Sequence, residues 1–144
     1  MKKEDKPKVG VGVIILDKEG KVLIGKRKGS HAPYYSIPGG SLDFGETFEG
    51  CARREAKEEA NLSIKDPQVI AVTNNLETSR KEGAHYISVI LLAKGFSGDL
   101  KIMETDKCEQ WLWADPNNLP RPHFDASARA IKSYLAGKFY IKLE

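Results

Sequence analysis

The hydrophobic residues near the N-terminus form two short runs separated by a polar turn. Val9–Leu16 is rich in β-branched and aliphatic residues, and the polar tetrapeptide Asp17–Gly20 follows it. A second apolar run, Val22–Ile24, comes directly afterwards. Two apolar runs joined by a turn that contains glycine are typical of paired strands. The pattern therefore predicts a β-hairpin over residues 9–24.

Further along the chain, apolar runs predict three more strands, at Val69–Asn74, His85–Lys94 and Trp111–Ala114. The first two are joined by a polar segment, Glu77–Gly83. The sequence Pro38-Gly39-Gly40 interrupts the pattern at a place where only glycine tolerates a positive φ at low cost.

Two segments have the composition of helices. Thr47–Ala60 is rich in Ala, Arg, Glu and Lys, with Thr47 as the expected N-cap. Asp125 is expected to cap a final helix that ends at Leu135, and three residues would form its inner face: Ala128, Ile131 and Leu135. Because the chain has no repeats and no long linker, we expect a single α+β domain over residues 1–144, with a flexible basic N-terminus at residues 1–8.

Composition narrows the class of protein. The chain has 144 residues, with 23 Lys and Arg against 20 Asp and Glu, a net charge of +3. This balance argues against a surface for polymeric nucleic acid. The longest apolar run, Val89–Ala93, is too short to cross a membrane, and no signal peptide is recognisable, so we expect a cytoplasmic protein. Cys51 and Cys108 lie far apart and are expected to be reduced.

The helix at residues 47–60 changes character along one face. At 100° per residue, Phe48, Cys51 and Ala52 share a stripe that should face the core, and Arg53, Arg54 and Lys57 should point away. The same stripe continues not to apolar residues but to three acidic ones: Glu55 and Glu59, with Glu58 on the flank. A face that begins apolar therefore ends in carboxylates.

Three neighbouring carboxylates cannot be buried without compensation, because each is costly to desolvate and all repel one another. Either this end of the helix opens to solvent, or a multivalent cation binds there. Carboxylates without His or Cys favour Mg²⁺ or Mn²⁺. The alternative is an ordinary surface helix with Glu49–Arg53 and Arg54–Glu58 ion pairs, in which Ala56 and Ala60 face the core and Glu58 lies in water.

Residues 40–62 carry a longer pattern that includes these glutamates. Six residues stand at fixed spacings: Gly40, Glu46, Arg54, Glu55, Glu58 and Glu59. This segment resembles the Nudix box, G-x5-E-x7-R-E-U-x-E-E-x-G-U, in which U is aliphatic, and every charged position matches. Asn61 replaces the last glycine, and Asn is the next-best residue for the left-handed conformation that ends a helix. Ala56 is small for the aliphatic position.

The resemblance implies an α/β/α Nudix sandwich with a mixed β-sheet between helices, and hydrolysis of a nucleoside diphosphate linked to another group. It implies that Glu55, Glu58 and Glu59 bind Mg²⁺, with Mn²⁺ as a substitute, and that the Gly40 carbonyl is a further ligand. It also implies that Glu46 and Arg54 orient the loop and helix. Phosphoryl transfer needs positioning and charge neutralisation, which a metal supplies. The general base is assigned to Glu55 or Glu58, or to a distal loop.

Outside the box the sequence offers further candidates. Asp106 or Glu109 could be a distal metal ligand or base, or an ordinary acid of a solvated loop. Four residues are candidates for substrate binding: Lys26, Arg27, His85 and Tyr86. Four aromatic residues could stack on a base or simply fill the core: Tyr34, Tyr35, Trp113 and Phe124.

Residues 9–114 are most similar to MutT-like nucleoside triphosphate diphosphatases, in particular to the branch that acts on modified purine nucleotides. The aromatic and proline residues that mark ADP-ribose hydrolases are not evident at the usual spacing. The expected reaction is Mg²⁺-dependent hydrolysis of a (d)NTP or modified purine NTP to NMP and pyrophosphate. The alternatives are hydrolysis of a nucleotide sugar or dinucleotide, or a catalytically silent nucleotide sensor. A homodimer is left open.

Overall fold

The computed structural model describes residues 6–143, so the first five of the eight residues predicted to form a flexible N-terminus lie outside the described chain. Three helices are present in this range: α1 (Phe48–Ala60), α2 (Leu76–Glu82) and α3 (Asp125–Ala136). The strands are β1 (Lys8–Ile15), β2 (Val22–Arg27), β3 (Tyr35–Ser36), β4 (Gly39–Ser41), β5 (Ser63–Ile64), β6 (Gln68–Asn74), β7 (Tyr86–Ala93), β8 (Phe96–Ser97) and β9 (Cys108–Ala114).

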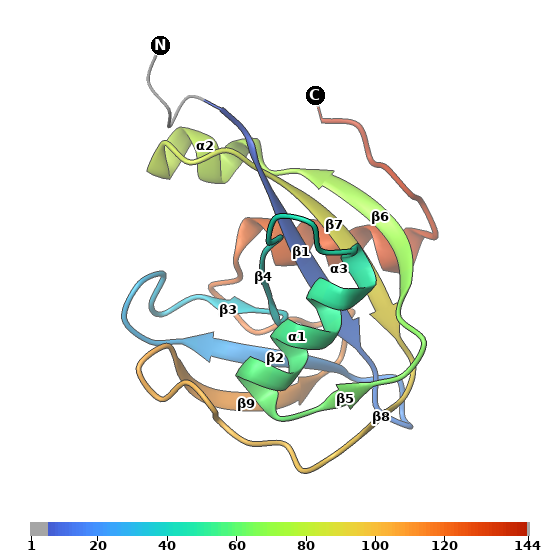
Figure 1. Cartoon of the computed structure of the whole chain (residues 1–144). Helices are drawn as coiled ribbons and strands as arrows, with labels where there is room; N and C mark the ends of the chain where they lie inside the picture. The colour runs from blue at the N-terminus through green and yellow to red at the C-terminus, as the bar shows by residue number, and fades with distance from the viewer. Residues whose placement is uncertain (1–5, 144) are drawn as a thin grey trace.

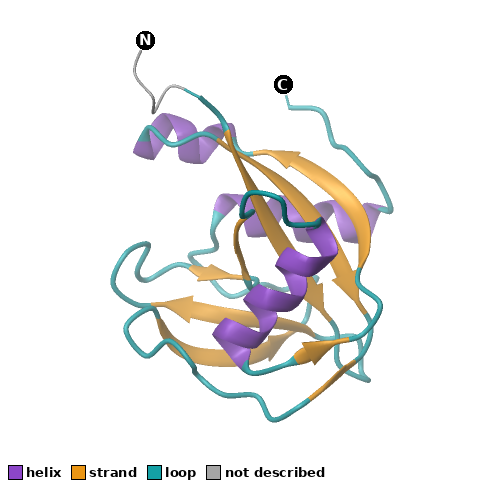
Figure 2. Cartoon of the chain, viewed as in Figure 1, coloured by secondary structure: helices purple, strands orange, loops and turns teal. Residues whose placement is uncertain are grey.

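The strands form three sheets. The largest has the order β4-β1-β7-β6, with β1 and β7 parallel and the outer pairs antiparallel, so it is a mixed sheet. A second, antiparallel sheet has the order β3-β2-β9, and β5 pairs with β8. Helices cover both faces of the mixed sheet, with α1 in front and α3 behind in Figure 1, and the layers are distinct in Figure 2. The predicted sandwich of helices around a mixed sheet is confirmed.

Each face of β1 contributes to a different part of the core. On one face, Val11, Val13 and Ile15 pack against four buried residues of α1: Cys51, Ala52, Ala56 and Ala60. On the other face, Ile14 packs with Ala130 and Ile131 of α3. Because β1 lies between α1 and α3, its position determines that of both helices.

The predicted hairpin of the first two strands is wrong. The chain does turn at residues 17–20, where the Asp17 carboxylate accepts hydrogen bonds from the backbone N–H groups of Glu19 and Lys21. Between the two strand regions, however, the ladder contains a single bridge, Leu16 to Val22, after which β1 and β2 enter different sheets. The sequence showed two apolar strands and a turn, but these local features do not specify the strands' partners.

Other differences from the sequence-based expectations concern α2, β9 and the shortest strands. Most of the polar segment at residues 77–83 belongs to the short helix α2, whose C-cap is Gly83 with a φ of 71°. The last strand, β9, begins at Cys108, three residues before the predicted start. Four two- or three-residue strands, β3, β4, β5 and β8, were not predicted at all.

The predicted N-cap and inner face of α3 also need correction. The N-cap is Phe124, and Asp125 is the first helical residue, whose carboxylate accepts a hydrogen bond from Arg129 Nε at 2.7 Å instead of capping the helix. Of the predicted inner residues only Ile131 is buried, whereas Ala128 is half-buried and Leu135 is 46% exposed. The inner face actually contains two serines, since its buried residues are Ser127, Ala130, Ile131 and Ser133.

Gly39 and Gly40 belong to strand β4 rather than to a turn, and neither has the positive φ that the sequence suggested. Their small size is required for a different reason. A Cβ at Gly39 would overlap the carbonyl oxygen of Val11 on β1, and one at Gly40 would lie 2.5 Å from the Glu55 carboxylate on α1. The two glycines therefore let β4 lie directly against both its neighbouring strand and the acidic end of α1.

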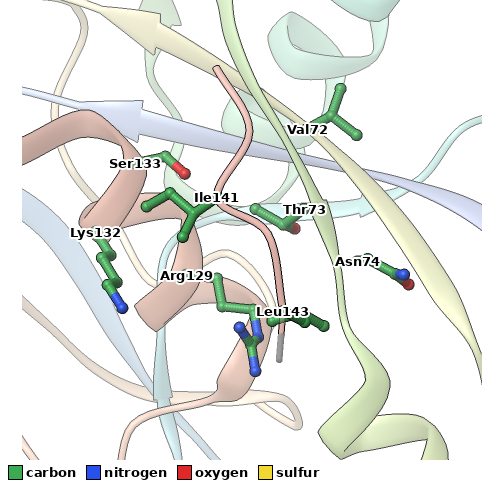
Figure 3. A pocket seen from close by; sticks show the side chains of 8 residues that line it. All are labelled: Val72, Thr73, Asn74, Arg129, Lys132, Ser133, Ile141 and Leu143. Carbon is green, nitrogen blue, oxygen red and sulfur yellow. The ribbon is translucent and has the colours of Figure 1, made fainter. Parts of the chain in front are cut away.

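The C-terminal segment after α3 lies along the outer strand β6. The backbone N–H of Val72 donates to the carbonyl oxygen of Phe139 at 2.9 Å. Beyond this bond, Ile141 and Leu143 lie over a shallow hollow between β6 and α3, which Ser133 also lines (Figure 3). The segment therefore covers part of the β6 edge.

The replacement of Gly39 by Ala tests the close packing of β4. The new Cβ would overlap backbone atoms, so we expect Gly39→Ala to lower the free energy of unfolding by about 1–3 kcal/mol. Gly95→Ala is the matched control, because the nearest atom to its added Cβ would be Lys65 Cδ at 3.7 Å. Urea unfolding measures both, and equal midpoints for the two variants would contradict the packing described for β4.

Candidate active site

The three glutamates near the end of α1 have unequal environments. The Glu55 side chain is only 13% exposed and Glu59 is half-buried, whereas the Glu58 side chain is 51% exposed. Phe48, which was expected to face the core, is 38% exposed, while Ala56 and Ala60 are buried. The apolar stripe of α1 is therefore tilted, so that two carboxylates are drawn inward and one remains in contact with solvent.

Strand β4 contacts the two inward carboxylates directly. The backbone N–H of Gly39 donates to Glu59 Oε1 at 2.8 Å. The Glu55 carboxylate lies where a side chain on Gly40 would otherwise be. The acidic end of α1 is thus enclosed on one side by a strand that contributes only backbone groups.

Local sequence accounts for the two ends of α1. Thr47 is the N-cap, as predicted, and its hydroxyl accepts a hydrogen bond from the N–H of Gly50 at 2.9 Å. At the other end, Asn61 adopts the predicted left-handed conformation with a φ of 63°. Its side-chain amide donates to the carbonyl oxygen of Asp99, which ties the end of the helix to the loop after β8.

Arg54 does not point away from the site as the helical pattern predicted. Its guanidinium donates to both carboxylate oxygens of Glu46, at 2.7 and 3.0 Å, and to Glu55 at 2.8 Å. It also contacts Glu58 at 3.3 Å and Asp43 at 3.4 Å. The long side chain folds back over the helix, so one cation connects the preceding loop to the acidic face.

The pKa values of these carboxyl groups are shifted in opposite directions. The hydrogen bond from Arg54, supported by the N–H of Asp43, lowers the pKa of Glu46 to about 2. Burial raises the pKa of Glu59 to about 8, and the negative charges of Glu55 and Glu104 add to the effect. Burial also raises the pKa of Glu55, although Arg54 opposes it. The site therefore holds two carboxylates whose ionisation lacks a sufficient countercharge.

The donor set fits a hard divalent cation. Within residues 6–143 no three acidic, His or Cys side chains are gathered into a preformed ion-binding group, because Arg54 holds Glu55 and Glu58 while Gly39 holds Glu59. Nevertheless, the side chains that converge here are carboxylates, the ligands that Mg²⁺ and Mn²⁺ prefer, and the backbone of Gly40 lies against one of them. A cation would also supply the countercharge that the half-buried glutamates require.

A cavity of about 680 Å³ extends from the acidic end of α1 into the space between the sheets and α3. Its lining includes acidic residues (Glu55, Glu58, Glu59, Glu104), basic residues (Lys26, Arg27, Lys107) and aromatic residues (Tyr86, Trp111, Phe124). A cavity of this size is in the range that binds a small ligand such as a mononucleotide. Charged groups of both signs are therefore brought together around a space of nucleotide size.

The predicted substrate-binding residues are only partly brought together. Lys26, Arg27 and Tyr86 line the cavity, but His85 does not, because its ring bonds to Asn74 Oδ1 at 2.7 Å. Lys26 forms an ion pair with Glu109 at 3.1 Å, which raises the pKa of the lysine. Arg27 also lies near the acidic helix, since its positive charge opposes the rise in the pKa of Glu59.

The two predicted distal acids are not in the cavity lining. Glu109 is engaged by Lys26, and the Asp106 side chain lies outside the cavity. The acid that does line it is Glu104, which acts electrostatically on both Glu55 and Glu59. The sequence showed three acids in this loop, but nothing local indicated which of them would face inward.

The aromatic residues divide between the cavity and the core. Phe124 lines the cavity and contacts the His31 ring edge-to-face at 5.2 Å between centroids. Trp113 stacks on Phe96 and packs against the core, whereas Trp111, which was not a candidate, lines the cavity. Trp111 lies over Gly25 of β2, where a Cβ would come within 2.7 Å of its ring. A glycine on the neighbouring strand was the signal that could have identified it.

Residues 6–134 match the family model described as the NUDIX domain, and the chain belongs to this family. Together with the helix-bound carboxylates and the mixed-sheet sandwich, the match makes the chain a Nudix hydrolase, a pyrophosphohydrolase. Residues 6–143 contain no helix with the length and hydropathy that a membrane span needs.

The similar proteins differ in the activity for which they are named. The chain is 34% identical over 127 residues to an ADP-ribose pyrophosphatase of Methanocaldococcus jannaschii, a match that covers 86% of this chain and 71% of the relative. A 72-residue stretch, 50% of this chain and 40% of the relative, is 38% identical to the RNA pyrophosphohydrolase of Serratia proteamaculans. The crystal structure of a MutT NUDIX hydrolase from Burkholderia pseudomallei matches with a TM-score of 0.80 and 29% identity, covering 89% of this chain and 98% of that one.

The raised pKa of Glu59 predicts a pH dependence of stability in the metal-free protein. Between about pH 5 and pH 8 the folded state keeps a proton that the unfolded chain has lost, so the free energy of unfolding should fall as pH rises. Urea unfolding with EDTA at several pH values measures this slope. Glu59→Gln should flatten it and Glu49→Gln should not, and an unchanged slope in Glu59→Gln would contradict the environment described for Glu59.

Proposed function

We propose that the chain hydrolyses a nucleoside triphosphate, canonical or with a modified purine base, to NMP and pyrophosphate with Mg²⁺ or Mn²⁺. The observation that carries the proposal is the cavity, which joins the acidic end of α1 to basic and aromatic residues in a volume suited to one nucleotide. The likeness to a MutT NUDIX hydrolase, at a TM-score of 0.80 and over 98% of that chain, supports it.

In this proposal the residues of α1 and β4 bind the metal, which when bound neutralises phosphate charge and lowers the pKa of a water molecule. Glu55, Glu58, Glu59 and the Gly40 carbonyl are its ligands. Glu46 and Arg54 orient this set through their bidentate ion pair at 2.7 and 3.0 Å. Glu104 takes the distal position that we expected at Asp106 or Glu109.

The remaining roles follow from position in the cavity. Arg27 and Lys26 contact the phosphates, and Tyr86, Trp111 and Phe124 surround the nucleoside. Glu55 or Glu58 removes the proton from the attacking water, and the 51% exposure of Glu58 favours this residue because it is the one in contact with solvent. The substrate is a small nucleotide rather than polymeric nucleic acid, in line with the net charge of +3.

A second substrate class is favoured by one comparison. The ADP-ribose pyrophosphatase of Methanocaldococcus jannaschii is 34% identical over 86% of this chain. We therefore retain the hydrolysis of a nucleoside diphosphate linked to a sugar as the alternative. It would use the same metal-binding glutamates and differ only in the group bound beyond the second phosphate.

Glu58→Gln tests the metal-ligand assignment. The amide keeps the size of the side chain but removes its charge, so turnover should fall by at least about 100-fold. The fold should be unaffected, because Glu58 is largely exposed and its side chain contacts only Arg54 among the described salt bridges. Thermal unfolding checks folding, and Glu49→Gln on the same helix is the control; a Glu58→Gln enzyme with most of its turnover would contradict the assignment.

A substrate panel separates the two classes. We expect kcat/KM to be highest for one of the canonical, oxidised or methylated (d)NTPs, with pyrophosphate as a product. ADP-ribose, nucleotide sugars and dinucleoside polyphosphates complete the panel, and release of a sugar phosphate at higher kcat/KM would favour the alternative. Nucleotide binding in millimolar Mg²⁺ without turnover of any compound would contradict both and leave a nucleotide sensor.

A further inference from the structure

A chain of hydrogen bonds connects α3 to the segment that leads into β4. Ser127, on the inner face of α3, is only 1% exposed. Its hydroxyl oxygen accepts a hydrogen bond from the backbone N–H of Ile37 at 2.9 Å and lies 2.7 Å from His123 Nε2. The other ring nitrogen, His123 Nδ1, lies 3.1 Å from the carbonyl oxygen of Pro120. Four groups from two distant parts of the sequence are therefore linked in series.

The direction of each hydrogen bond follows from the chemistry of its partners. A carbonyl oxygen can only accept, so His123 Nδ1 carries the proton and donates to Pro120. Burial lowers the pKa of His123, which favours a neutral ring whose Nε2 accepts from the Ser127 hydroxyl. The Ser127 oxygen is then oriented with a lone pair toward the N–H of Ile37. Ser127 is thus a fixed acceptor.

Ile37 stands immediately before the residues that contact the acidic helix. Two residues on, the N–H of Gly39 donates to Glu59, and Gly40 lies against Glu55. The intervening Pro38 restricts the backbone, and its carbonyl oxygen accepts from the N–H of Val13 at 2.9 Å. Because only Pro38 separates Ile37 from Gly39, a displacement of Ile37 would alter the path of the backbone into Gly39 and Gly40.

We propose that Ser127 and His123 are positioning residues for the metal-binding carboxylates, acting from the opposite face of the sheet through the backbone at residues 37–40. The inference rests on the metal site of the proposed function. Without the Ser127 hydroxyl, the buried N–H of Ile37 loses its acceptor, which is costly enough to make the segment shift toward another partner. The contact of Gly39 with Glu59 and of Gly40 with Glu55 shifts with it.

The binding of Mn²⁺ alone tests the proposal without relying on turnover. Electron paramagnetic resonance measures the concentration of free Mn²⁺ during a titration, which gives the Kd of the full chain for Mn²⁺. We expect Ser127→Ala to weaken Mn²⁺ binding by about 10-fold, the lower end of the effect of losing an outer partner of a metal site. Ser133→Ala is the matched control, because Ser133 is buried on the same helix but lines the hollow beneath the C-terminal segment (Figure 3).

Kinetics give a second measurement that general destabilisation would not reproduce. We expect Ser127→Ala to raise the Mg²⁺ concentration for half-maximal rate, and to regain much of kcat at saturating Mg²⁺. His123→Leu removes the acceptor of the Ser127 proton but keeps the Ser127 oxygen, so its effect should be smaller and in the same direction. If Ser127→Ala does not fold, His123→Leu provides the test of the proposal.

Glu59→Gln, measured in the same Mn²⁺ titration, distinguishes a failure of the positioning role from a failure of the proposed metal site. Weaker Mn²⁺ binding in Glu59→Gln with wild-type binding in Ser127→Ala and His123→Leu would overturn the positioning role and leave the proposed function intact. Unchanged binding in Glu59→Gln would contradict the metal site itself, and the positioning role with it. Equal losses in Ser127→Ala and Ser133→Ala would also overturn the role, since they would indicate a general loss of packing.

Discussion

The close approach of strand β4 to helix α1 is the constraint on which the site depends. Because Gly39 and Gly40 have no side chains, the strand backbone lies against Val11 on one side and Glu55 on the other. This proximity lets a backbone N–H reach Glu59 and encloses two carboxylates that the helix alone would leave in water. The close contact between β4 and the acidic end of α1 therefore depends on two residues that contribute no side-chain atoms.

The positive charge of Arg54 is not shared equally among the carboxylates near the contact between β4 and α1. Arg54 holds Glu46 in its ionised form and reaches the near edge of the acidic face, but its direct contacts do not extend to Glu59. Glu59 is therefore left with a raised pKa, because burial and its acidic neighbours make its carboxyl group difficult to ionise. One arginine cannot neutralise Glu46, Glu55, Glu58 and Glu59 together, so this end of the cavity would favour a bound cation.

Local rules predicted α1 well, since the Thr47 cap and the left-handed Asn61 depend on residues close in sequence. The sandwich was predicted through the resemblance of residues 40–62 to the Nudix box, whose spacing is itself a structural pattern. The metal-binding role of Glu55, Glu58 and Glu59 stays a prediction. Predictions failed where distant pairings decide the outcome. The partners of β1 and β2 lie elsewhere in the chain, Arg54 folds back toward a loop, and the conformation of another loop selects Glu104. Ser127 contacts Ile37 across 90 residues of sequence, which no local pattern could indicate.

The C-terminal segment has a consequence for behaviour in concentrated solution. Within residues 6–143, β6 pairs with a strand on one side only, and the free edge of an aliphatic strand can pair with the same edge of another molecule. The bond from Val72 to Phe139 occupies one position on that edge, and Ile141 and Leu143 cover the apolar surface beside it. The last residues of the described chain therefore leave less of this strand edge open to pairing with another molecule.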